Sequence, residues 1–126
     1  MKTHDEMNSI TRQIIGCAFE VGCELGIGYA EKVYENALVF EMRSRGLRVD
    51  QQVPLKVHYK GVVVGEFLAD VVVEGCVLLE LKAKAAIADA HVAQCLNYLK
   101  TTGLHVALIL NFGTTRVQTK RVVRGF

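Results

Sequence analysis

Three charged residues stand in a part of the chain whose other residues predict buried strands. Asp70 lies in one apolar run, and Glu80 and Lys82 lie in the next. An ionised group in an apolar sheet is costly unless it is paired or bound to a metal. The two runs therefore predict a functional site.

The turn between the two runs decides whether the carboxylates can meet. A three-residue turn over residues 74–76 pairs Val73 with Val77 and sets Asp70 opposite Glu80, whereas a two-residue turn sets them on opposite faces. The glycine in the middle of the turn favours three residues, because that turn needs a positive φ. We therefore expect the two Cβ atoms to lie about 5 Å apart.

Two carboxylates at that separation repel each other. One of them would stay protonated unless a cation lies between them. A divalent metal is the natural occupant of such a position. Lys82 shares a face with Glu80, because side chains alternate along a strand, and it would lie beside the metal.

The remaining apolar patterns predict the elements that hold this hairpin. A spacing of three and four predicts helices, and alternation or a short apolar run predicts strands. The expected order is α-α-β-β-β-α-β-β, an α/β fold with a central mixed sheet flanked by helices on both faces. The elements outside the hairpin are helices at about 5–25, 30–45 and 86–102, and strands at 53–60, 105–112 and 116–123.

Two of the helices carry patterns that bear on the site. The second has two apolar stripes, and Glu31 shares the side of Tyr34. The third has a polar side with Gln94 and Tyr98, to which His91 adds a weaker signal. Its predicted core stripe is Ala88, Val92, Leu96 and Leu99.

Composition limits the class of protein. A chain of 126 residues with 51% hydrophobic residues predicts one globular domain, spanning 1–126. It has neither a run of about 20 apolar residues nor an apolar N-terminal signal, so we expect a cytoplasmic protein without a membrane span. The four cysteines form no CxxC pair and are expected to be small core residues.

Charge is distributed unevenly along the chain. Residues 83–126 hold six Lys and Arg against one acid, whereas residues 1–50 hold six against eight. A basic face can attract phosphate backbones. A solvated edge strand guarded by charge explains the basic C-terminal stretch equally well.

Two further motifs extend the pattern beyond the hairpin. Residues 28–34 fit Gly-x2-Glu-x2-Tyr, and Gln94 and Tyr98 form a Gln-x3-Tyr pair. With Asp70 and Glu80-Leu81-Lys82, the chain resembles the PD-(D/E)XK nuclease superfamily, which has the restriction-endonuclease-like fold. Within it the chain looks like the GxxExxY family over nearly its whole length. Ala69 stands where the superfamily name has proline.

The resemblance implies roles for these residues. Asp70 and Glu80 would hold Mg²⁺ or Mn²⁺, and Lys82 would orient water or stabilise developing negative charge. Glu31 could be another metal ligand or only a first-turn carboxylate that the helix dipole favours. The pair at Gln94 and Tyr98 would line the cleft near the substrate phosphate, or else form a polar seam between helix and sheet.

The function that follows is a metal-dependent nuclease acting on nucleic acid, with DNA as the expected substrate. The alternative is a module that keeps the nuclease fold and binds nucleic acid or a protein without cutting. A homodimer could bring two sites to two strands.

Overall fold

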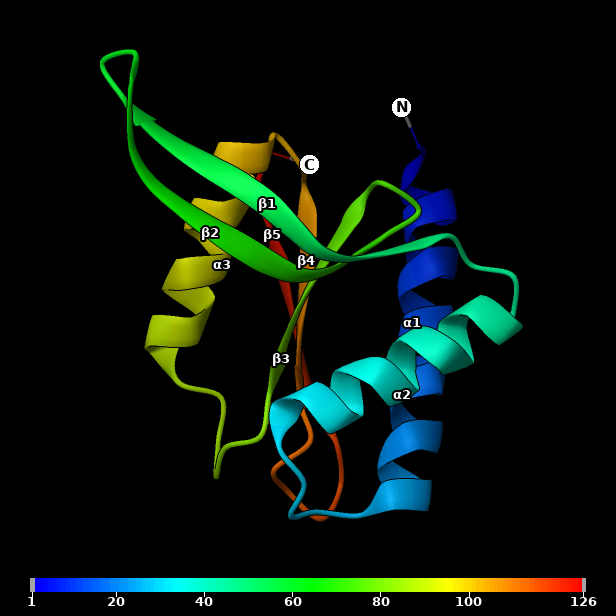
Figure 1. The fold of residues 1–126 in the computed structure, drawn as a ribbon. Coiled ribbons are helices and arrows are strands. Elements are labelled where there is room, and N and C mark those ends of the chain that lie inside the picture. The colour runs from blue at the N-terminus through cyan, green and yellow to red at the C-terminus, as the bar shows by residue number, and fades with distance from the viewer. Residues whose placement is uncertain (1, 126) are drawn as a thin grey trace.

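A twisted sheet of five strands runs through the centre of the molecule (Figure 1). The computed structural model describes residues 2–125. The strands lie side by side in chain order, and the element order confirms the predicted α/β fold. The elements are α1 (His4–Leu25), α2 (Glu31–Ser44), β1 (Val49–Tyr59), β2 (Val62–Val73), β3 (Val77–Lys82), α3 (Asp89–Thr102), β4 (Val106–Asn111) and β5 (Gln118–Val123).

The sheet is mixed, as predicted. β3 and β4 pair in parallel through the α3 crossover, and the other neighbouring strands pair antiparallel. A parallel pair needs a long connection, which α3 supplies. Helices cover both faces: α1 and α2 lie on one side of the sheet and α3 on the other (Figure 1).

Each face has its own apolar core. The larger core joins α1 and α2 to the odd-numbered residues of β3, among them Leu79 and Leu81. The smaller core joins Cys95 and Leu99 of α3 to Leu78 on the opposite face. Glu80 follows Leu78 by two residues and therefore belongs to the α3 side of the sheet.

Helix rotation corrects one sequence-based expectation. In α2 the apolar stripe of Tyr34, Leu38 and Met42 is buried. The neighbouring stripe, Val33, Ala37 and Phe40, is less buried, and Phe40 is 74% exposed. In α3 the predicted core stripe is wrong in part, because Ala88 and Leu96 are exposed while Cys95 is fully buried. Cysteine is small and apolar enough to let α3 approach the sheet closely.

The cysteines do not behave alike. All four are free thiols, and Cys17 and Cys95 are buried as predicted. Cys76 is half-buried, and Cys23 is exposed, so the expectation of a core residue is wrong there. Cys23 lies near the end of α1, on the side of the helix turned away from the sheet.

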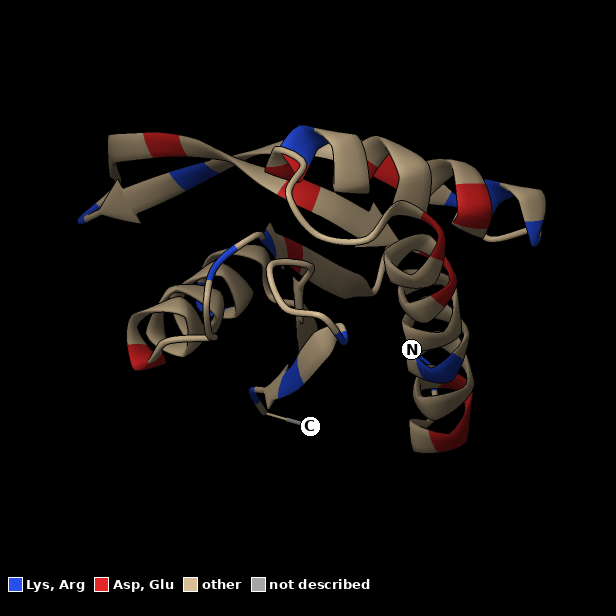
Figure 2. Ribbon diagram, turned by 90° about the horizontal axis from the view of Figure 1, so that it is seen from below, with Lys and Arg blue, Asp and Glu red and all other residues tan. Residues whose placement is uncertain are grey.

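The edge strands carry polar residues. β1 begins four residues earlier than predicted, and Pro54 lies on this edge, where a missing N–H costs little. β5 forms the other edge, and among its residues only Val122 is buried. Its basic residues Lys120 and Arg121 are exposed, as expected for an edge guarded by charge. Figure 2 colours basic residues blue along this strand. No helix in the described part of the chain is long and apolar enough to cross a membrane.

Candidate active site

The hairpin has the three-residue turn that the sequence predicted. Val73 pairs with Val77, and the register continues through Val71 and Leu79. Within the turn both Glu74 and Gly75 have positive φ, at 53° and 63°. This register directs Asp70 and Glu80 toward each other across the two strands.

Asp70 stands where β2 separates from β3. The paired residues end at Val71 and Leu79. One step further, the Asp70 carboxylate Oδ2 accepts a hydrogen bond from the Leu81 backbone N–H at 2.8 Å. A side chain therefore satisfies the backbone donor that β2 no longer reaches, and this bond holds the carboxylate next to Glu80.

Glu80 is buried without full hydrogen bonding. The residue is 6% exposed, and within residues 2–125 its Oε1 atom has no hydrogen-bond partner. Burial, followed by the neighbouring charge of Asp70, raises the pKa of Glu80 to about 8. Burial also raises the pKa of Asp70, although the hydrogen bond from Leu81 opposes this. Both carboxyls ionise at neutral pH only if a cation joins them.

Lys82 follows Glu80 by two residues on β3, so its side chain leaves the strand on the same side as Glu80. It is half-buried, and its charge lowers the pKa of both Asp70 and Glu80, although burial outweighs it. Across the described part of the chain Lys82 forms no ion pair with either carboxylate. The structure thus leaves its ammonium group available for a substrate or water.

Glu31 approaches the pair from the first turn of α2. Its charge contributes to raising the pKa of both Asp70 and Glu80, so it lies in their electrostatic neighbourhood. It is exposed, and among residues 2–125 no group of three His, Cys, Asp or Glu side chains lies close enough to hold a metal. Glu31 is therefore a neighbour of the site but is not gathered into a preformed ligand set.

Tyr34 fixes the start of α2. Its hydroxyl donates to the Gly26 carbonyl at 2.6 Å and accepts from the Tyr29 N–H at 3.2 Å. Its ring stacks on Phe112 with centroids 4.8 Å apart. Tyr34 is a core aromatic with a satisfied hydroxyl. Its two hydrogen bonds hold the backbone before α2, the helix whose first residue is Glu31.

The two residues of the Gln-x3-Tyr pair differ in their surroundings. Tyr98 is half-buried and stacks on Phe67, with ring centroids 4.1 Å apart. Burial and then the charge of Glu80 raise the pKa of Tyr98 to about 12. Gln94 is exposed one turn earlier. His91 instead caps the helix, because its Nδ1 accepts from the Ala88 N–H at 3.0 Å.

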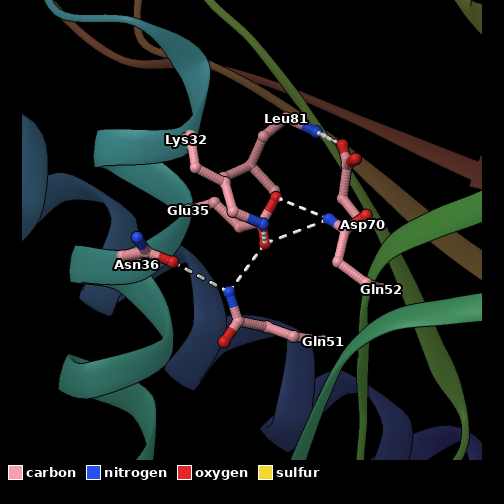
Figure 3. A network of polar contacts seen from close by, with 7 residues as sticks. All are labelled: Lys32, Glu35, Asn36, Gln51, Gln52, Asp70 and Leu81. Atoms are coloured by element: carbon pink, nitrogen blue, oxygen red, sulfur yellow. Dashed lines mark hydrogen bonds and ion pairs between the residues drawn. The ribbon is translucent and has the colours of Figure 1, made fainter.

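A buried carboxylate near Asp70, Glu35, was missed by the sequence analysis, and its charge helps to raise the pKa of Asp70. Glu35 is 4% exposed and accepts hydrogen bonds from the side-chain amides of Gln51, at 2.6 Å, and Gln52, at 3.0 and 3.1 Å. It also pairs with Lys32 at 2.9 Å. Figure 3 shows these side chains converging between α2 and the edge of the sheet, with Asp70 beside them.

This network acts on the backbone opposite Asp70. Gln52 has a φ of 54°, rare for a residue other than glycine inside a strand. In the register it falls opposite Asp70, between the pairs Gln51–Val71 and Val53–Ala69. Glu35 thus anchors the irregular residue that faces Asp70. The spacing from Glu35 to Leu38 and Met42 places it on the buried face of α2, which is a signal that could have identified it.

Asn111 anchors the chain just after Lys82, its partner in the β3–β4 register. The fully buried amide accepts from the N–H groups of Lys84 and Gly113 and donates to the Lys84 carbonyl and to Gln118. All four of its hydrogen-bonding positions are used. A polar residue at the end of an otherwise apolar strand was the signal for this role.

The donors present fit a hard divalent cation. Two carboxylates offer oxygen atoms, one of them the unpartnered Oε1 of Glu80. Mg²⁺ and Mn²⁺ prefer oxygen and commonly use one or two carboxylates, with water completing the shell. Asp70 and Glu80 are therefore the residues that would hold such an ion.

One comparison with known proteins identifies the superfamily of this chain. A model of the PD-(D/E)XK nuclease superfamily matches residues 8–122. The chain belongs to this superfamily, and its element order and mixed five-stranded sheet are consistent with the superfamily's fold. A search of curated proteins finds no match. A search of solved structures finds none either.

Proposed function

We propose that this protein is a Mg²⁺- or Mn²⁺-dependent nuclease that hydrolyses phosphodiester bonds, with DNA as the expected substrate. The observation that carries the proposal is the buried Oε1 of Glu80, which has no partner among residues 2–125 and lies beside Asp70. A bound cation would turn this costly arrangement into a ligand set. The superfamily of nucleases to which the chain belongs supports the same activity.

Each residue has a role in this proposal. Asp70 and Glu80 hold the ion, and the Leu81 N–H keeps the Asp70 carboxylate in position. When bound, a divalent ion lowers the pKa of a coordinated water and offsets negative charge on the phosphate. Lys82 orients water or stabilises the charge that develops on the phosphate. Glu31 is proposed as a further metal ligand, which reaches the ion from α2 directly or through water.

Two narrower assignments accompany the nuclease proposal. The Gly-x2-Glu-x2-Tyr motif at residues 28–34 supports membership of the GxxExxY family. Gln94 and Tyr98 are proposed to contact the substrate from α3. A homodimer and a cytoplasmic location stay predictions from the sequence.

A cleavage assay tests the activity directly. Single- and double-stranded DNA and RNA are incubated with Mg²⁺ or Mn²⁺, with an EDTA control. Asp70→Ala and Lys82→Ala should each lower the rate by roughly a hundredfold or more, as expected for loss of a group that stabilises the transition state. Asp50→Ala and Lys120→Ala remove the same charges at exposed positions and should leave the rate unchanged. Activity that survives both site substitutions would refute the assignment.

A non-catalytic binding module is the second candidate. The observation in its favour is that three metal ligands do not gather among the described residues. Calorimetric titration with Mn²⁺ separates the two functions. Binding that disappears in Asp70→Ala and Glu80→Ala supports the nuclease, and absence of binding to the wild-type protein supports the module.

A further inference from the structure

A cavity of about 470 Å³ opens between the β1–β2 hairpin and the C-terminal half of α3. Phe67 of β2 and Tyr98 of α3 line it, and their rings stack at an interplanar angle of 21°. Lys56 and His58 line it from β1, and Lys100 lines it from α3. Figure 1 shows the tip of the β1–β2 hairpin projecting past the end of α3.

The cavity adjoins the candidate active site through one shared residue. Tyr98 lines the cavity, and its phenol is close enough to Glu80 and Asp70 to be influenced by their charges. A polymer with one phosphate at the carboxyl pair would therefore reach the cavity by passing Tyr98. Phe67 of the cavity wall lies three residues before Asp70 on β2, about 10 Å along the strand, so neighbouring units of one nucleic-acid strand can span the two places.

The lining has the composition that recognises a nucleotide. Aromatic rings offer a surface on which a base can stack, and lysines attract the backbone phosphates. The lining contains no acid. Glu66 pairs with one of these lysines, since its Oε1 lies 3.9 Å from Lys56 Nζ in a solvent-exposed ion pair. The volume falls within the usual range for small-molecule pockets.

We infer that this cavity binds one unpaired nucleotide of the strand whose phosphodiester lies at Asp70 and Glu80, so the substrate class is single-stranded nucleic acid or an unpaired end. Its link to cleavage rests on the proposed nuclease function, but nucleotide binding does not. A base inside a duplex is stacked and paired, and it can enter the cavity only after extrusion, which costs free energy.

Binding in EDTA tests the inference without cleavage. Fluorescence anisotropy compares a labelled single-stranded oligonucleotide with the duplex of the same sequence. We expect the single strand to bind at least about tenfold more tightly, because only its bases stack without extrusion.

The lysines provide a matched comparison. The double variant Lys56→Gln with Lys100→Gln should weaken single-strand binding about tenfold. It should also reduce the slope of log K against log salt concentration by roughly 1.4 in magnitude, since each lost phosphate contact contributes about 0.7. The control variant Lys60→Gln with Lys120→Gln removes the same charge from the hairpin tip and β5 and should weaken binding by less than about twofold. Glu66→Gln should tighten binding, because it frees Lys56.

The aromatic wall is tested by 2-aminopurine in the single strand. Stacking should quench its fluorescence on binding, and Tyr98→Leu should reduce the quenching while thermal melting verifies that the variant is folded.

Equal affinity for duplex and single strand, or equal loss in the two double variants, would overturn the inference. If wild-type binding shows the expected pattern but no cleavage occurs, the nuclease proposal fails and the cavity assignment stands. If cleavage requires Asp70 but the cavity variants bind normally, the cavity assignment fails alone.

Discussion

The surroundings of Glu80 favour the protonated form of its carboxyl group when no metal is bound. Its pKa is raised from 4.5 to about 8, first by burial and then by Asp70. Between these two pH values the folded protein binds more protons than the unfolded chain. Stability of the metal-free protein must therefore fall as pH rises through that window.

Glu80→Gln removes this ionisation while keeping the shape of the side chain. In EDTA at about pH 8.5 the substitution should raise the free energy of unfolding by about 1–3 kcal/mol, and near pH 5 it should change little. Urea denaturation at both pH values measures the difference. Glu24→Gln, at an exposed position of α1, is the control and should have no such pH dependence. A gain that is equal at both pH values would contradict this account of Glu80.

At the scale of elements, α2 and β1 support the strand that carries Asp70. Glu35 accepts hydrogen bonds from the side chains of Gln51 and Gln52. The backbone of Gln52 has a positive φ at the position opposite Asp70. These contacts join residues 16 and 17 positions apart. We infer that Glu35 positions Asp70 through the β1 backbone, because the structure shows no hydrogen bond between Glu35 and Asp70 or Glu80 among residues 2–125.

Loss of the Glu35 carboxylate should affect both folding and the site. Glu35→Ala leaves the Gln52 amide without its acceptor and the Gln51 amide with Asn36 Oδ1 alone, so we expect about 1–3 kcal/mol of destabilisation. Mn²⁺ affinity measured by calorimetry should also fall, because Asp70 is less well fixed. Glu41→Ala removes an exposed ion pair with Arg45 on the same helix and should cost less than about 1 kcal/mol. Unchanged Mn²⁺ affinity in Glu35→Ala would show that Asp70 needs no such support.

A close approach of two loops fixes the chain after Lys82. A Cβ atom on Gly113 would lie within 2.6 Å of backbone atoms of Ala83 and Lys84, contacts that a backbone cannot relieve easily. Gly113→Ala should therefore destabilise the fold by about 1–3 kcal/mol or more. At Gly65 an added Cβ meets nothing within 4 Å, so Gly65→Ala is the matched control and should be nearly neutral. Thermal unfolding of the two variants compares them, and equal melting temperatures would contradict the close packing.

At the scale of the whole molecule, the sheet brings together elements that are distant in the sequence. α2 reaches the carboxyl pair from one side and α3 from the other, while β2 and β3 carry the pair itself. Binding of an ion at this junction should stabilise the entire fold, because the ligand set exists only in the folded state.

Mn²⁺ should therefore raise the melting temperature of the wild-type protein. At roughly a hundred times Kd the gain in stability should be about 3 kcal/mol. Asp70→Ala should lose the Mn²⁺-dependent increase, and Asp50→Ala, an exposed carboxylate of β1, should retain it. An equal increase in all three proteins would indicate non-specific binding. Differential scanning calorimetry with EDTA as the reference makes the measurement.

The sequence was most informative where local rules decide the structure. The order of elements followed from apolar periodicity, and the hairpin register followed from a three-residue turn with a central glycine. Asp70, Glu80 and Lys82 were visible because charge is rare in buried strands. Each of these signals depends on neighbours within a few residues, which is why the sequence alone was sufficient.

Tertiary structure alone decided the features that depend on contacts across the chain. The rotation of α3 buried Cys95 instead of Leu96, and the periodicity of a short helix could not settle that choice. The Glu35 anchor and the cavity beside Tyr98 each join separate elements, so no local pattern contains them. The sequence determined that Asp70 and Glu80 face each other, and the packing of α2, α3 and the hairpin decided what surrounds them.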